Sequence, residues 1–197
     1  MKENATRERI VQAADKLFYE RGYEATSFAD IADAVTLSRG NFYHHFKTKD
    51  AILLAVIALR KANTAAMLDH WAGAAHEPAE RIRSFIRILI VNRAQIRLYG
   101  CPVGTLCGEL AKLGHPAQAE ASGLFTLFRD WLRREFVRLG RESDADALAM
   151  HVLARSQGIA TLASAFHDDR FIDQETAGLS AWLDGLVASQ PSPSTHS

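Results

Sequence analysis

The stretch Leu37 to Asp50, LSRGNFYHHFKTKD, gathers side chains that can bind phosphates and form hydrogen bonds with base edges. It holds three aromatic residues, two adjacent histidines and three cations, and its only acid is the last residue. The whole chain balances 23 Lys and Arg against 23 Asp and Glu, so its net charge does not argue for a nucleic-acid ligand. Affinity for phosphates follows local patches of cations, and this stretch is such a patch.

A helix over residues 38 to 45 would have two faces, because successive residues turn by about 100°. Phe42 would lie on the inner face with Ser38 and His45. The outer face would carry Arg39, Gly40, Tyr43 and His44. Such a face is either a surface for phosphates and base edges or a solvated face whose Tyr and His are incidental. The helical wheel does not decide between them.

The elements that position this stretch are helical, because apolar residues recur at helical spacing and glycines and prolines mostly separate the periodic segments. We predict an all-α chain of about nine helices. The first three are short and cover about 6–21, 28–34 and 38–44, with Thr26 or Ser27 as the cap of the second. The last two of these predict a helix-turn-helix. Lys49 adds a cation at the start of the next helix, a ready anion site.

Longer helices fill the rest of the chain. We predict them over about 49–70, 78–98, 117–139, 148–166 and 179–187, with a short helix between residues 100 and 116. The predicted domains are a helix-turn-helix domain (1–48), a helical regulatory and dimerisation domain (49–188) and a disordered tail (189–197).

Composition favours a globular cytoplasmic protein. With 48% apolar residues, 197 residues can bury a substantial core. The longest strongly apolar run, residues 51 to 59, is shorter than the roughly 20 residues that a membrane span needs. Two cysteines are too few for a disulfide framework. We therefore expect no membrane association.

Residues 6 to 53 resemble the DNA-binding domain of the TetR family of bacterial transcriptional repressors. The resemblance joins the pattern AADKLFYERGYEATSF to IADAV-LSRGNFYHHF-TK at the family's spacing, over about a quarter of the chain. It implies a homodimeric repressor whose recognition helices enter successive major grooves of a pseudo-palindromic, double-stranded operator. It also implies release by a small-molecule inducer of unknown identity in the C-terminal domain, and it implies neither enzymatic activity nor a cofactor.

The resemblance carries DNA contacts over to matching positions. These are Thr26, Ser27, Ser38, Arg39, Gly40, Asn41, Tyr43, His44 and Lys49. We assign Tyr43, His44 and Lys49 to phosphates, and Arg39 and Asn41 to base edges.

Thr36 departs from the family pattern, which commonly has glycine in the turn between the two helices. Threonine is β-branched and resists the positive φ that glycine adopts readily. We expect the turn either to differ in shape or to be strained.

The regulatory part offers seven candidate ligand or sensor residues. They are Cys101, Cys107, His115, Phe128, Trp131, His151 and Arg155. The aromatic residues line an apolar pocket or belong to the core. Pro102 would begin a helix and leave Cys101 at its cap, where the helix dipole favours a thiolate and hence a redox or electrophile sensor. The alternative is a pair of buried apolar thiols. No CxxC or HxxxH spacing supports a metal site.

If the family pattern holds, the last two helices form the dimer interface. The candidate interface residues are Ile159, Leu162, Phe166, Leu179, Trp182, Leu183 and Leu186. The alternative is that the same stripe is intramolecular core.

Two rival functions belong to other classes. An enzyme would need Cys101, His115 and Glu109 as nucleophile, base and orienting group, and the sequence does not fix their geometry. An interaction protein that has lost operator binding would be supported only by Thr36.

Overall fold

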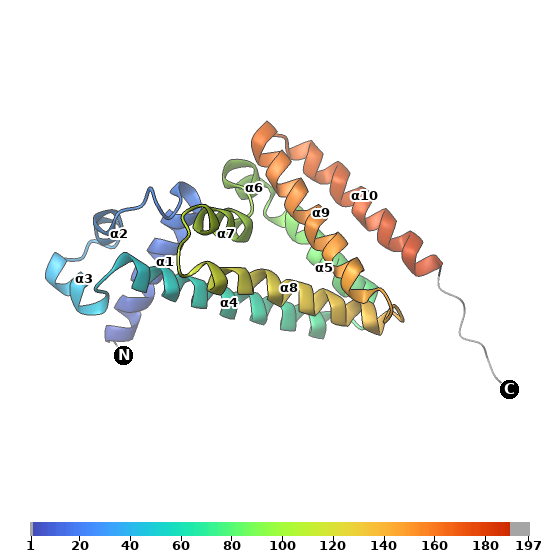
Figure 1. Ribbon diagram of the computed structural model, residues 1–197, viewed down its shortest axis with the longest axis horizontal. Helices are drawn as coiled ribbons and strands as arrows, with labels where there is room; N and C mark the ends of the chain where they lie inside the picture. Colours follow the sequence, from blue (N-terminus) through green and yellow to red (C-terminus); the bar gives the residue numbers. More distant parts are fainter. Residues whose placement is uncertain (1, 190–197) are drawn as a thin grey trace. The chain divides into compact units, whose positions relative to one another are not determined.

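The computed structural model describes residues 2–189, and within this range the chain forms ten helices and no strand (Figure 1). The all-α prediction is confirmed. The helices are α1 (Lys2–Arg21), α2 (Phe28–Ala34), α3 (Arg39–His45), α4 (Lys49–Ala74), α5 (Pro78–Val91), α6 (Arg93–Tyr99), α7 (Pro102–Lys112), α8 (Gln118–Arg138), α9 (Ala145–Phe166) and α10 (Asp169–Ala188). Apart from Ser189, the predicted disordered tail lies outside the described residues.

One predicted helix is divided in two. The helix expected over 78–98 breaks at Asn92, whose backbone has φ −100° and ψ 11°. The Asn92 side chain and backbone N–H both donate to the carbonyl of Ile88, at 3.0 Å each. Asparagine competes for backbone hydrogen bonds in this way, so it ends α5 and α6 begins at Arg93.

The chain divides into two compact units. The first comprises Met1–Met67 and Cys101–Leu127, and the second comprises Leu68–Gly100 and Phe128–Ser197. Helices α4 and α8 therefore each contribute to both units. The predicted boundary near residue 48 divides the chain by function, into the helix-turn-helix and the regulatory domain, and it stays a prediction.

In the first unit, α1, α2, α3 and the start of α4 share an apolar core. Its fully buried side chains include Ile10, Ile31, Phe42, Ile52 and Leu53. Helix α4 is long and apolar enough to cross a membrane by length and composition, and it extends well beyond the short run noted in the sequence. This is weak evidence for a span, because a core helix of a soluble protein passes the same test.

The second unit is built from the ends of α4 and α8 together with α5, α6, α9 and α10. In it α5 packs against α10 and α9. Its buried carboxylate, Glu135 on α8, accepts hydrogen bonds from Arg81 at 3.3 Å and from Arg138. A buried charge without such partners would be strongly unfavourable, so these arginines make its position tolerable.

Candidate nucleic-acid interface

Helix α2 begins with a reciprocal cap. The Ser27 hydroxyl oxygen accepts from the backbone N–H of Asp30 at 3.1 Å, and the Asp30 carboxylate accepts from the Ser27 backbone N–H at 2.7 Å. This capping box satisfies two backbone donors that a helix start leaves unpaired. Hydrogen bonds from the Ser27 hydroxyl and backbone hold the pKa of Asp30 below its usual value. Ser27 is exposed, as a DNA contact requires.

The turn between α2 and α3 keeps the conformation of a glycine turn although it contains Thr36. Thr36 has φ +53°, in the left-handed region, and its backbone N–H donates to Asp33 at 3.1 Å. A β-branched residue is disfavoured in this region, by roughly 1–2 kcal/mol. Of the two expectations for this turn, the strained one is therefore observed.

Helix α3 presents two faces, largely as the helical wheel predicts. Phe42 is fully buried and His45 is half-buried, whereas Tyr43 is 48% exposed. Gly40, Asn41 and His44 are also exposed. Ser38 differs from the prediction: it is exposed and caps α3, its hydroxyl oxygen accepting from the Asn41 backbone N–H at 3.4 Å. A cap lies outside the first helical turn, so the wheel misplaces it.

The phenol of Tyr43 is held in place by its neighbours. Its ring lies 5.0 Å from the ring of Phe28 on α2, and Phe28 packs edge-on against the buried Phe42 at 4.7 Å. The Lys47 ammonium donates to the Tyr43 carbonyl at 2.5 Å. The outer face of α3 therefore carries an oriented aromatic side chain with a polar tip. The side chain of Arg39 lies outside the described part of the structure.

The side chains of two predicted DNA contacts, Thr26 and Lys49, form hydrogen bonds within the protein. Thr26 is fully buried and its hydroxyl donates to the Gly22 carbonyl at 2.7 Å, so its side chain supports the turn and cannot reach DNA. Lys49 is half-buried: its ammonium donates to the Tyr23 carbonyl at 2.9 Å and lies 4.1 Å from the centre of the Tyr23 ring. The hydrogen bond to Tyr23 uses one of the three N–H donors of the Lys49 ammonium.

Cys101 occupies the predicted cap position. Its sulfur accepts from the Gly104 backbone N–H at 3.5 Å, and Pro102 is the first residue of α7. Both cysteines are free thiols, Cys101 half-buried and Cys107 buried. Burial raises the pKa of the Cys107 thiol. No group of three His, Cys, Asp or Glu side chains able to hold a metal occurs among the described residues.

Three further sensor candidates, His115, Phe128 and Trp131, have structural partners. The His115 ring packs on Tyr23 at 5.1 Å, its Nε2 lies 3.7 Å from the Asp50 carboxylate, and its Nδ1 accepts from the Ala117 backbone N–H at 3.1 Å. Phe128 and Trp131 are 9% and 3% exposed, and they pack edge-on against the buried Phe85 and the half-buried Trp71 in the second unit. These two aromatic residues therefore belong to the core.

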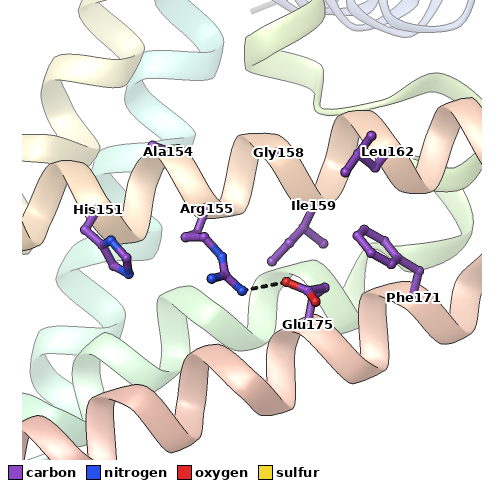
Figure 2. Close-up of a pocket in the computed structure, with 8 residues that line it drawn as sticks. All are labelled: His151, Ala154, Arg155, Gly158, Ile159, Leu162, Phe171 and Glu175. Atoms are coloured by element: carbon purple, nitrogen blue, oxygen red, sulfur yellow. Dashed lines mark hydrogen bonds and ion pairs between the residues drawn. The ribbon is translucent and has the colours of Figure 1, made fainter.

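His151 and Arg155 line an open groove of about 340 Å³ between α9 and α10 (Figure 2). The Arg155 guanidinium pairs with the Glu175 carboxylate at 2.5 Å across the groove, as the dashed line in Figure 2 shows. The His151 ring lies 4.5 Å from the ring of Trp182. The walls of the groove are otherwise mostly apolar, with Leu162 and Phe171 at one end (Figure 2).

The predicted dimer-interface residues fall into two groups. Ile159, Leu179 and Leu183 are at most 2% exposed within the single chain, so they are intramolecular core and the interface prediction is wrong for them. Leu162 and Phe166 are exposed, at 44% and 74%. Trp182 and Leu186 are half-buried. Periodicity marks an apolar stripe but does not tell which partner covers it.

Small residues occupy much of the exposed face of α9 and α10. On α9 and α10 the exposed positions include Ala147, Ala154, Gly158, Ala165, Gly178, Ala181 and Gly185, with the larger Met150 beside them. The run from 154 to 166 shows this enrichment in small residues, but the sequence does not say that they share the solvent-facing side.

Comparison with known proteins agrees with this architecture. The family model described as bacterial regulatory proteins, tetR family, matches residues 10–56. An uncharacterised HTH-type transcriptional regulator of Lactococcus lactis is 32% identical over 123 residues, which are 61% of this chain and 63% of that protein. The match thus spans less than two thirds of that relative.

Two further matches cover more of the chain. The HTH-type transcriptional repressor DhaR of a Mycobacterium species is 25% identical over 172 residues, 80% of this chain and 82% of that protein. The crystal structure of a TetR transcriptional regulator from Legionella pneumophila superposes with a TM-score of 0.76 at 26% identity, covering 91% of this chain and 95% of that one. Residues 10–56 are thus a helix-turn-helix domain of the TetR family, and the chain has the fold of TetR transcriptional regulators.

Proposed function

We propose that the protein is a ligand-responsive repressor that binds a pseudo-palindromic operator as a homodimer. The observation that carries the proposal is the outer face of α3, where Asn41, Tyr43 and His44 are exposed around a buried Phe42. A major groove admits an α-helix, and amide, phenol and imidazole groups at its surface suit base edges and phosphates. Asn41 and Arg39 are assigned to base edges, and Tyr43 and His44 to phosphates.

The homodimer is proposed to form through the exposed face of α9 and α10. Small side chains there allow two helix pairs to approach closely, and the exposed Leu162 and Phe166 would be buried in the contact. The groove lined by His151 and Arg155 lies on the same face and would be covered by the second copy. A two-fold dimer presents two recognition helices, which matches the symmetry of a pseudo-palindromic site.

Repression and release by a small molecule are proposed for this chain from its relatives. The Mycobacterium relative is named as a repressor, which supports that sign of regulation. The inducer is proposed to bind the helical part that follows the helix-turn-helix. For such a repressor we also propose a place in the cytoplasm, where chromosomal DNA lies, and a binding function instead of an enzymatic one. Two of the three residues that an enzyme would need contact Tyr23: the His115 ring packs on the Tyr23 ring, and Glu109 accepts from the Tyr23 backbone N–H.

Fluorescence anisotropy tests the proposal. Labelled DNA from upstream of the protein's own coding region is titrated against a shuffled control at several salt concentrations. We expect selective binding whose affinity falls about 10³-fold or more between 50 and 200 mM salt, as many phosphate contacts require. Equal weak binding to both DNAs, repeated with DNA selected from a randomised library, would contradict operator recognition.

A second candidate keeps the same fold and adds sensing of oxidants or electrophiles through Cys101. It is favoured by one observation, the half-buried sulfur at the start of α7, where it accepts a backbone N–H. Partly exposed thiols are the ones that oxidants and alkylating agents reach.

A further inference from the structure

The turn that joins α1 to α2 is held by a carboxylate from far along the chain. Glu109 on α7 accepts from the backbone N–H of Tyr23 through Oε2 and from that of Glu24 through Oε1, both at 2.9 Å. Hydrogen bonds to an ionised acceptor are roughly twice as strong as neutral ones. One side chain thus fixes two successive peptide groups just beyond the end of α1.

The turn is shaped for this carboxylate. Gly22 has φ +93°, where other residues are strained, and a Cβ at this position would come within 3.0 Å of the Glu109 Oε1. Glycine therefore serves both the backbone conformation and the close approach of the acceptor.

The same turn leads directly into the DNA-reading helices. The Thr26 hydroxyl donates to the Gly22 carbonyl at 2.7 Å, and the next residue, Ser27, caps α2. Phe28, the first residue of α2, packs against both Phe42 and Tyr43 of α3. A short chain of contacts thus runs from the Glu109 carboxylate to the exposed phenol of the recognition helix.

A second set of contacts holds the same turn from the side of α4. The Tyr23 hydroxyl donates to the Asp50 carboxylate at 2.5 Å, and the ring of His115, just beyond α7, packs on the Tyr23 ring. Tyr23 is 4% exposed, and burial, followed by its hydrogen bond to Asp50, raises its pKa, so the hydroxyl remains a donor. Helix α7 and its following turn therefore contact both segments that flank α2 and α3.

We propose that Glu109 is a positioning residue for DNA binding, whose carboxylate sets the orientation of α2 and α3 by fixing the turn at residues 22–26. The inference rests on the proposed operator binding. It makes the place of α7 in the first unit a determinant of operator affinity, although none of the residues assigned to DNA contacts lies on α7.

The test compares Glu109→Gln with a matched control, Glu120→Gln. The glutamine at 109 keeps the size of the side chain but has a single acceptor oxygen, and its NH₂ group would face a backbone N–H. Glu120 lies on α8 in the same unit and pairs with Lys61 at 2.6 Å at the surface, so its loss leaves the turn intact. Binding of operator DNA is measured by anisotropy well below the unfolding temperature, and amide hydrogen exchange is measured by NMR.

We expect Glu109→Gln to bind operator about tenfold more weakly, because it loses one charge-assisted hydrogen bond. Glu120→Gln should bind as the wild type does. The amides of Tyr23 and Glu24 should exchange faster in Glu109→Gln, and those of α9 should be unchanged. A merely stabilising role would lower the unfolding temperature and leave the affinity of the folded protein intact.

Wild-type affinity in a folded Glu109→Gln protein whose Tyr23 and Glu24 amides exchange faster would overturn the inference. If that variant is incompletely folded, Glu109→Asp, which keeps the charge and shortens the reach by one methylene, is judged by the same two outcomes. A wild-type protein that binds no DNA selectively overturns the proposed function instead, so the two failures are distinguishable.

Discussion

The outer face of α3 makes different predictions for its phosphate-binding and base-reading residues. Tyr43→Ala should weaken binding to operator and to unrelated DNA alike, because a phosphate contact carries no sequence information. Arg39→Ala should cost about 1–3 kcal/mol and also relax the preference for operator, because a guanidinium reads base edges. Anisotropy titrations of both variants with operator and with unrelated DNA measure the ratio of the two affinities in each variant. An equal loss of discrimination in both variants would show that the roles are misassigned.

At Thr36 the backbone itself predicts a gain in stability. Thr36→Gly removes a side chain from a left-handed conformation, worth about 1–2 kcal/mol, and adds flexibility to the unfolded chain, worth about 0.5–1 kcal/mol. We expect a net stabilisation of about 0.5–1 kcal/mol in urea unfolding. Thr126→Gly, at an exposed position inside α8, is the control and should destabilise the protein. Destabilisation by both substitutions would mean that the turn is unstrained.

The two thiols should react at different rates. Cys107 is buried, and burial raises the pKa of its thiol, so at pH 8 a smaller fraction of Cys107 is thiolate than in a free cysteine. Iodoacetamide should therefore modify the half-buried Cys101 first. Raising the pH should narrow the difference, because the Cys107 thiolate then forms. Mass spectrometry of peptides over a time course measures both rates.

Substitution of Cys101 tests the proposal that this residue senses oxidants or electrophiles. A mild oxidant or an alkylating agent should release operator from the wild type and leave Cys101→Ser bound, in anisotropy at one DNA concentration. Identical release from both proteins would exclude Cys101 as the sensor.

At the scale of elements, local signals predict the helix-turn-helix better than the rest of the chain. Gly22 and Ser27 end or cap helices through groups within three or four residues, so the sequence displays them. The break at Asn92 was missed because it contains neither Gly nor Pro. It depends on an amide that bonds to the carbonyl of Ile88 instead of staying in solvent.

The candidate site shows the same division between local and distant causes. The outward face of α3 follows from helical periodicity alone, whereas the burial of Thr26 and the capture of Lys49 by Tyr23 depend on contacts across the fold. The Glu109 contact, 85 or more residues away from its partners, leaves no periodic signal in the sequence. In the sequence, Glu109 stands out only as the orienting group that an enzyme would need.

On the scale of the whole molecule, the exposed face of α9 and α10 makes the assembly testable. Ile159, Leu179 and Leu183 already fill the core of the single chain, so only the residues that remain exposed can hold a second copy. Among them Gly158 has open space around it: a Cβ there would meet nothing within 4 Å. A large side chain at this position is therefore tolerated by the single chain and would obstruct a second copy.

Gly158→Arg should accordingly convert the proposed dimer to a monomer without unfolding the chain. Gly73→Arg, at an exposed and equally open position of α4, is the matched control and should remain dimeric. Sedimentation velocity distinguishes the 21.8 kDa chain from an assembly of twice that mass. The monomeric variant should also lose most of its operator affinity, since each half-site is then bound separately. A Gly158→Arg protein that stays dimeric would place the interface on another surface.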